Sequence, residues 1–127
     1  MVDANNGNYL QDLRESTPLK YSALMIRIET IVGNWVGYTT ARERFTLLQS
    51  ASYPPEELWG LNPTINFEGS AQSVIHDLTK TITYRGMSII PYLTAIREKV
   101  DETDPTQKKV AESLDKLLVE LTELKKD

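Results

Sequence analysis

The residue best suited to acid–base chemistry is His76, because it is the one histidine in the sequence. A hydrolase of the Ser–His–Asp type would need this ring as its base, a nucleophile beside it and an acid to orient it. Ser73 lies one helical turn before His76, but Asp77 would point about 100° away on a helix and cannot orient the ring. No nucleophile-elbow pattern is present. We therefore predict a surface or half-buried histidine and no catalytic triad.

Two groups of carboxylates could suggest a divalent-ion site or a glycosidase pair. Glu56 and Glu57 stand where a short helix should begin, and their charge favours the positive end of the helix dipole. The run from Asp101 to Asp104 lacks the oxygen-ligand spacing and central glycine of a calcium loop. The glycines match neither phosphate-loop nor dinucleotide fingerprints, and the chain has no cysteine. We expect no metal, no cofactor and no enzymatic activity.

Aromatic and leucine side chains suggest binding to another protein instead. Exposed aromatics dominate interface hot spots, which makes Trp59 and Tyr92 candidate interface residues. Core packing is the competing interpretation, because the chain has only two tryptophans and two phenylalanines to fill a core. Leu117 and Leu121 lie on an apolar seam that either closes the bundle or pairs with another chain. The candidate interface residues are therefore Trp59, Tyr92, Leu117 and Leu121.

The charge pattern disfavours nucleic acid as a partner. The formal net charge is −4, and the excess of acid is concentrated after Asp101. The adjacent basic pairs, Lys108-Lys109 and Lys125-Lys126, are interspersed with acidic residues and form no basic stripe. No apolar run reaches the length of a membrane span, and the first residues lack the parts of a signal peptide. We predict a cytoplasmic protein that binds neither nucleic acid nor membrane.

Hydrophobic spacing predicts an all-α bundle of about six helices, one of them short, and no sheet. Either Thr39 or Thr40 is a candidate helix cap, and Trp35 and Val36 should anchor a turn in the core. On the second helix, charged residues that include Arg44 are expected on the outer faces. The predicted helices run from Thr17-Pro18 to Gly33, from Thr39 or Thr40 through Leu48, from Pro55 to Leu61, from Ser70 to Arg85-Gly86, from Ser88 to Val100 and from Thr106 through Leu124.

The length of 127 residues fits one domain, which we divide into three parts. Residues 1–16 form a flexible or loosely docked lead, with a short helix from Tyr9 to Arg14. Residues 17–105 form the core of the bundle. Residues 106–127 form an amphipathic helix that packs on the bundle or extends to a partner.

One stretch of the sequence carries a series of short motifs: Phe67-Glu68-Gly69-Ser70-Ala71, then Val74, then Arg85-Gly86, and an aliphatic helix that closes near Asp104-Pro105. This series resembles the effector-associated domains of bacterial conflict and signalling proteins, which are death-like helical adaptors. The match extends roughly from Tyr21 to Pro105. The sequence departs from the pattern at Ile75, where the family commonly has an aromatic residue.

The resemblance implies a death-like fold and a non-catalytic adaptor in prokaryotic defence or signalling. Such a module recruits its effector through contacts between like helical domains. Its partner would be another helical adaptor domain, or a fused or neighbouring effector such as a protease or an NTPase. The alternative is a structural or regulatory homo-oligomer assembled through the seam that contains Leu117 and Leu121.

Overall fold

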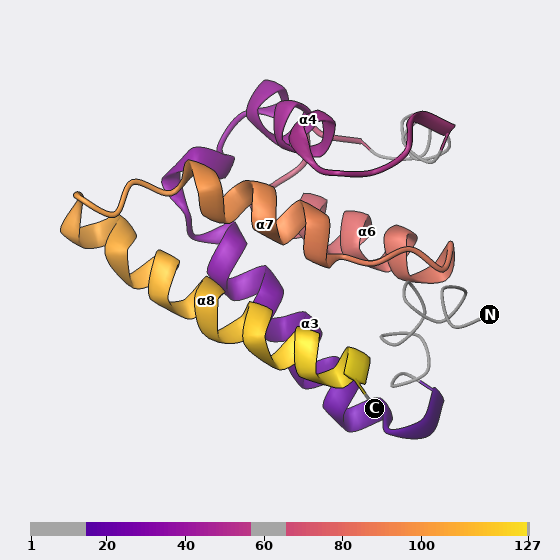
Figure 1. Cartoon of the computed structure of the whole chain (residues 1–127). Coiled ribbons are helices and arrows are strands. Elements are labelled where there is room, and N and C mark those ends of the chain that lie inside the picture. Colours follow the sequence, from indigo (N-terminus) through magenta and orange to yellow (C-terminus); the bar gives the residue numbers. More distant parts are fainter. Residues whose placement is uncertain (1–14, 57–65, 127) are drawn as a thin grey trace.

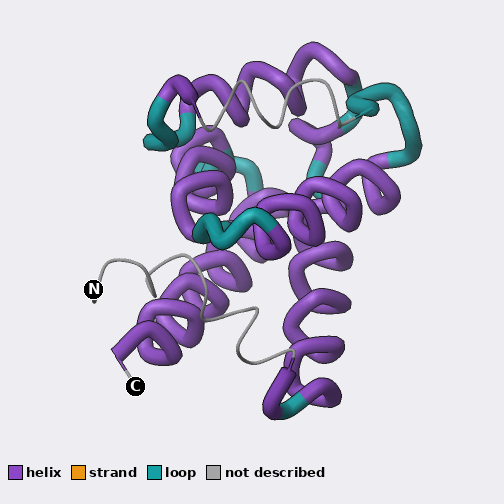
Figure 2. The backbone as a smooth tube through the Cα atoms, turned by 90° about the vertical axis from the view of Figure 1, so that its right-hand side faces the viewer, coloured by secondary structure: helices purple, strands orange, loops and turns teal. Residues whose placement is uncertain are grey.

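The computed structural model describes residues 15–56 and 66–126, and the regular structure within these ranges is entirely helical (Figures 1 and 2). The predicted all-α bundle is therefore confirmed. The described ranges hold five α-helices and one short 3-10 helix. They are α3 (Pro18–Gly33), η1 (Val36–Tyr38), α4 (Ala41–Ser50), α6 (Ala71–Tyr84), α7 (Ile90–Lys99) and α8 (Pro105–Lys126).

Local capping chemistry explains where several helices begin and end. Pro18 occupies the first turn of α3, where a missing N–H costs little. The Thr40 hydroxyl accepts a hydrogen bond from the Glu43 amide, and the Glu43 carboxylate accepts one from the Thr40 amide, which completes a capping box. The Ser70 hydroxyl caps α6. Gly86 has a φ of 74°, the left-handed conformation that commonly ends a helix, and it lies at the stop predicted at Arg85-Gly86.

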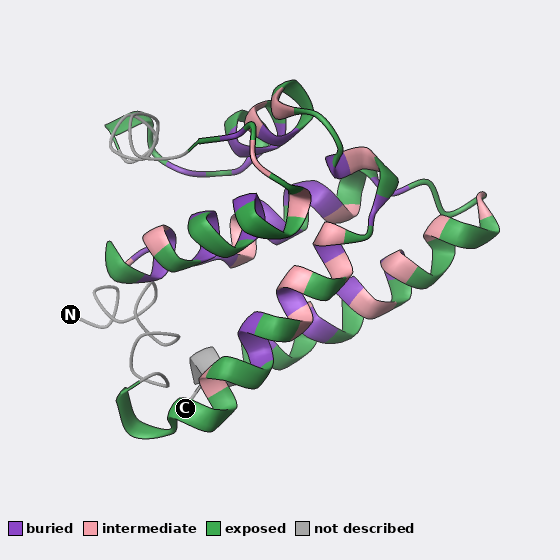
Figure 3. Ribbon diagram, turned by 180° about the vertical axis from the view of Figure 1, so that it is seen from behind, coloured by how far each residue is buried: buried purple, intermediate pink, exposed green. Residues whose placement is uncertain are grey.

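The helices pack in neighbouring pairs around one core. α3 packs mainly on α6, and α8 contacts both α7 and α3. α4 packs on α7, so that α7 lies between α4 and α8 in Figure 1. The close approach of α3 and α6 depends on Gly33, because a Cβ there would lie 2.6 Å from Cγ of Gln72. In Figure 3, buried residues lie along the inward sides of the helices.

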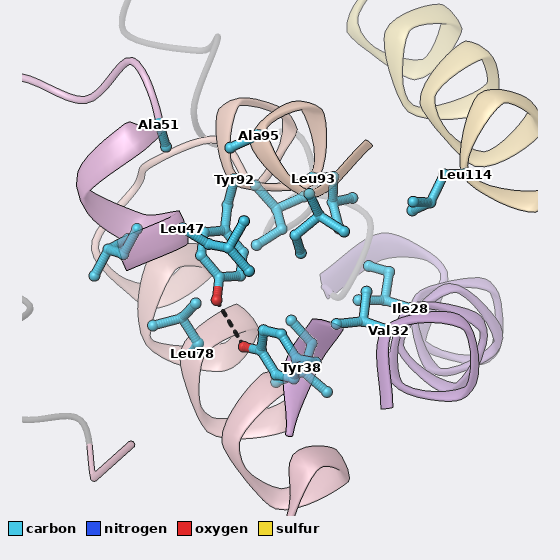
Figure 4. Close-up of a cluster of buried hydrophobic side chains, with 14 of the residues drawn as sticks. Ile28, Val32, Tyr38, Leu47, Ala51, Leu78, Tyr92, Leu93, Ala95 and Leu114 are labelled. Atoms are coloured by element: carbon cyan, nitrogen blue, oxygen red, sulfur yellow. Dashed lines mark hydrogen bonds between the residues drawn. The ribbon is translucent and has the colours of Figure 1, made fainter. Parts of the chain in front are cut away.

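Side chains from every described α-helix meet in the core, as Figure 4 shows for a large part of it. Ile28 of α3, Leu78 of α6 and Leu114 of α8 are fully buried. Tyr38 and Tyr92 bring two hydroxyls into this apolar region, and their oxygens lie 2.7 Å apart. Burial, as the largest cause, raises the pKa of both phenols above its ordinary value. Both tyrosines therefore stay neutral.

Several predictions made from the sequence differ from the structure or lie outside it. The predicted short helix begins at Pro55, but residues 57–65 lie outside the described residues, as does the predicted helix from Tyr9 to Arg14. Trp35 is buried as expected, whereas Val36 is 58% exposed and does not anchor the turn. Val36 begins the 3-10 helix, whose inward side is taken by Tyr38.

Candidate functional site

The described candidate interface residues from the sequence are buried and form no surface. Trp59 lies outside the described residues. Tyr92, Leu117 and Leu121 each have 0% exposure and belong to the core. In the single chain these three side chains are thus unavailable to a partner, and the core-packing interpretation fits them.

His76 is paired with an acid that sequence reasoning did not connect with it. Its Nδ1 lies 2.5 Å from Oε2 of Glu29, which belongs to α3 and is 47 positions away in the sequence. The His76 side chain is 47% exposed, as expected for a half-buried histidine. Because water reaches the pair, it contributes at most about 1 kcal/mol to stability. We interpret it as a link between α3 and α6.

A groove of about 360 Å³ lies beside this pair, and we call it the α3/α6 groove. Ile26 is 62% exposed at its edge, and Tyr84 on α6 is half exposed. Leu19, which is 88% exposed, lies two helical turns before Ile26 on the same face of α3. The groove is lined by Tyr21, Ser22, Met25, Ile26, Glu29, His76, Lys80 and Tyr84.

A second groove, of about 400 Å³, involves α4, the last turn of α7 and the turn before η1; we call it the α4/α7 groove. Its apolar part is made by the Trp35 ring and Leu47, both nearly buried. Gly37 lies directly on the ring, since a Cβ at this position would overlap it. Two exposed cations, from Arg42 and Lys99, also line the groove, together with Glu43 and Thr46.

Arg44 is the largest departure from the sequence prediction, because it is 4% exposed and does not face solvent. Its guanidinium donates hydrogen bonds to the backbone carbonyls of Tyr38, Thr39, Phe67 and Gly69 at 2.6–3.3 Å. The group also lies over the Tyr38 ring, 5.4 Å from its centroid. Arg44 therefore ties α4 to the residues that precede both α4 and α6.

Of the two predicted carboxylate groups, the run from Asp101 to Asp104 has structural partners, whereas Glu57 of the other pair lies outside the described residues. Asp101 accepts hydrogen bonds from the amide and hydroxyl of Thr103. These bonds, led by that from the hydroxyl, lower the pKa of Asp101. Asp104 accepts from the amide of Thr106 at the start of α8. Within residues 15–56 and 66–126, no three His, Asp or Glu side chains are grouped closely enough to hold a metal ion.

The motifs that carry the family resemblance have clear roles in folding. Phe67 packs edge-on against Phe45, with ring centroids 5.5 Å apart. The carbonyl of Gly69 accepts from Arg44, and the hydroxyl of Ser70 caps α6. Gly86 ends the same helix. These motifs therefore explain how this part of the chain folds and do not themselves form a binding surface.

Comparisons with known proteins return nothing. No protein-family model, curated protein or solved structure matches this chain. Among the described helices, none combines the length and the apolar character that a membrane crossing requires. Any function must therefore be inferred from the surfaces described above.

Proposed function

We propose that this chain is a non-catalytic adaptor module that recruits an effector through contacts between like helical domains. The observation that carries the proposal is a pair of exposed apolar residues on one face of α3, Leu19 and Ile26, of which Ile26 also lines the α3/α6 groove. Single exposed apolar residues are common on protein surfaces, but those that lie on one helix face beside a groove favour an interface. The sequence resemblance to effector-associated domains adds prokaryotic defence or signalling, in the cytoplasm, as the setting.

Mechanistically, contacts of modest affinity suffice for such a module. When sensors cluster, tethered domains experience a raised effective concentration, so weak contacts become populated. The charges of Glu29 and Lys80 at the groove would select the partner more than they would tighten binding. Any catalytic step would belong to the recruited protease or NTPase.

The test is self-association of the purified chain, measured by sedimentation over a wide concentration range. We expect a reversible dimer or larger assembly that Ile26→Glu abolishes, because the substitution puts a carboxylate on this apolar face of α3. The matched control is Val119→Glu, since Val119 is 57% exposed on α8. Circular dichroism should show both variants folded. A wild-type chain that stays monomeric at millimolar concentration, or equal effects of the two substitutions, would contradict the proposal.

The alternative, a homo-oligomer assembled through the seam of α8, has no structural observation in its favour. Leu114, Leu117 and Leu121 are fully buried within the single chain, where α8 contacts α7 and α3. The seam would have to leave this core before it could pair with a second chain.

A further inference from the structure

We propose that the α4/α7 groove is a separate docking site for a short acidic segment of a partner protein, one that also carries an apolar side chain. The site goes beyond the self-association proposed for the α3/α6 groove, and it uses different residues on different elements. Two properties of the groove carry the inference: the charge at its rim and the apolar surface below it.

The rim brings together two like charges from distant parts of the chain. Arg42 stands in the first turn of α4, and Lys99 is the last residue of α7. Both are exposed, and in the part of the chain that the structure describes neither forms an ion pair. By contrast, Arg27 is paired with Glu120, and Arg97 with Asp115. Like charges at one groove repel each other, and an incoming carboxylate would relieve this repulsion.

Glu43 also lines the groove, but its carboxylate is engaged at the start of α4. The Oε1 atom accepts hydrogen bonds from the amide and hydroxyl of Thr39 and from the amide of Thr40. This acid is therefore held by backbone and hydroxyl donors and is not paired with Arg42 or Lys99. Both cations remain available to a ligand.

The apolar surface explains why the ligand should be more than a simple anion. The Trp35 ring, against which Gly37 packs, and Leu47 are 4% and 3% exposed and form a small apolar floor of the groove. A volume of about 400 Å³ falls within the range of known ligand sites and accommodates an apolar side chain with its flanking backbone. The groove thus combines an apolar contact with two cations, which matches an acidic, amphipathic peptide.

A protein ligand fits this site better than a nucleic acid or a membrane. Both polyanions bind through extended basic surfaces, whereas this groove offers two cations and includes Glu43. The chain as a whole carries a net charge of −4 and repels a polyanion. A short segment with one or two carboxylates avoids most of that repulsion.

The test uses nuclear magnetic resonance on the full ¹⁵N-labelled chain. The probe is a synthetic seven-residue peptide with a central Phe, two Glu residues that match the two cations of the groove, and Leu and Gly at the remaining positions. We expect shifts at the Gly37 and Thr46 amides and at the Trp35 indole. The double variant Arg42→Glu/Lys99→Glu should raise Kd about tenfold or more, equivalent to roughly 1.4 kcal/mol. The matched control, Lys108→Glu/Lys109→Glu on α8, changes net charge equally and should leave Kd within about twofold.

Further binding measurements test whether the groove needs both the charge and the apolar side chains of its ligand. A peptide with Lys in place of Glu, and one with Ser in place of Leu and Phe, should both bind at least fivefold more weakly. Equal binding of either peptide, no shifts at the groove, or equal effects of the two double variants would overturn the proposal. The proposal would also be overturned if an oligouridylate or phosphatidylserine vesicles bound more tightly than the acidic peptide and did so through Arg42 and Lys99. Ile26→Glu should not alter this Kd, so the two proposed sites succeed or fail separately.

Discussion

Arg44 illustrates how a cation is held inside this bundle by backbone carbonyls, with no ion pair to a carboxylate among the described residues. A guanidinium has five N–H donors, and here they meet four backbone carbonyls. Hydrogen bonds to a charged group contribute about 1.5–3 kcal/mol each, which offsets the cost of desolvation. Arg44 fixes the segment before α6 against α4 through these side-chain-to-backbone contacts.

We predict that Arg44→Met lowers the free energy of unfolding by about 3 kcal/mol, because four carbonyls lose their charged donor. Denaturation in guanidinium chloride measures the change. Arg42→Met, on the exposed side of the same helix, is the matched control and should change stability by less than about 0.5 kcal/mol. Similar midpoints for the two variants would show that the buried hydrogen bonds contribute little.

At the scale of the helix, the start of α4 links stability to pH. Slight desolvation opposes the shift, but hydrogen bonds from Thr40 and Thr39 hold the pKa of Glu43 below its usual value. Because its pKa is lowered in the folded state, the ionised carboxylate stabilises the fold at pH values above the pKa that it has in the unfolded chain. This stabilisation is lost as the pH falls through the pKa of the folded state.

We therefore predict that wild-type stability declines as the pH falls below about 4.5, and that Glu43→Gln removes part of this decline. The carboxylate is mostly exposed, so the part that is lost should be less than about 1 kcal/mol. Thermal unfolding followed from pH 7 to pH 3 measures it. Glu112→Gln, an exposed position on α8, is the control. If the stability of wild type and of Glu43→Gln depends on pH in the same way, the capping box does not contribute to the pH dependence.

The helix ends were predictable from the sequence because their signals are local. The structure confirms Ser70 as a cap and Gly86 as a helix end, and of the two candidates Thr39 and Thr40 it selects Thr40 as the cap of α4. All of these residues act within a few residues of their own positions. Arg44 shows where local reading fails, since its acceptors at Phe67 and Gly69 lie 23 and 25 positions away. Its spacing from Leu47, Leu48 and Ala51 was the signal that could have placed it inward.

The candidate surfaces were much harder to predict. Both grooves depend on residues from different helices, such as Ile26 with Tyr84 or Arg42 with Lys99, and sequence spacing does not show which helices become neighbours. Composition also left two interpretations open, because the large apolar residues that suit an interface also suit a core. In the structure Tyr92 and Leu117 are core residues.

At the scale of the whole molecule, α8 completes the bundle with its apolar seam. Leu117→Glu would place a carboxylate among fully buried side chains, and we predict a loss of more than about 4 kcal/mol, enough to unfold most small domains. Circular dichroism should show lost helicity, and light scattering should show no folded smaller species. Val119→Glu should keep the native helicity. A folded monomer released from an oligomer by Leu117→Glu would instead support assembly through the seam.

Gln107, near the start of α8, connects two segments that are remote in sequence. Its Oε1 accepts hydrogen bonds from the Trp35 indole and from the Asp101 amide, at 3.0 Å each. A backbone amide in the turn before α8 is thus bound to the same atom as a buried ring that follows α3. Local opening of this turn would release the indole as well, so solvent exchange at Asp101 should report on motion of the core. A peptide bound in the α4/α7 groove, which Trp35 lines, should therefore slow that exchange.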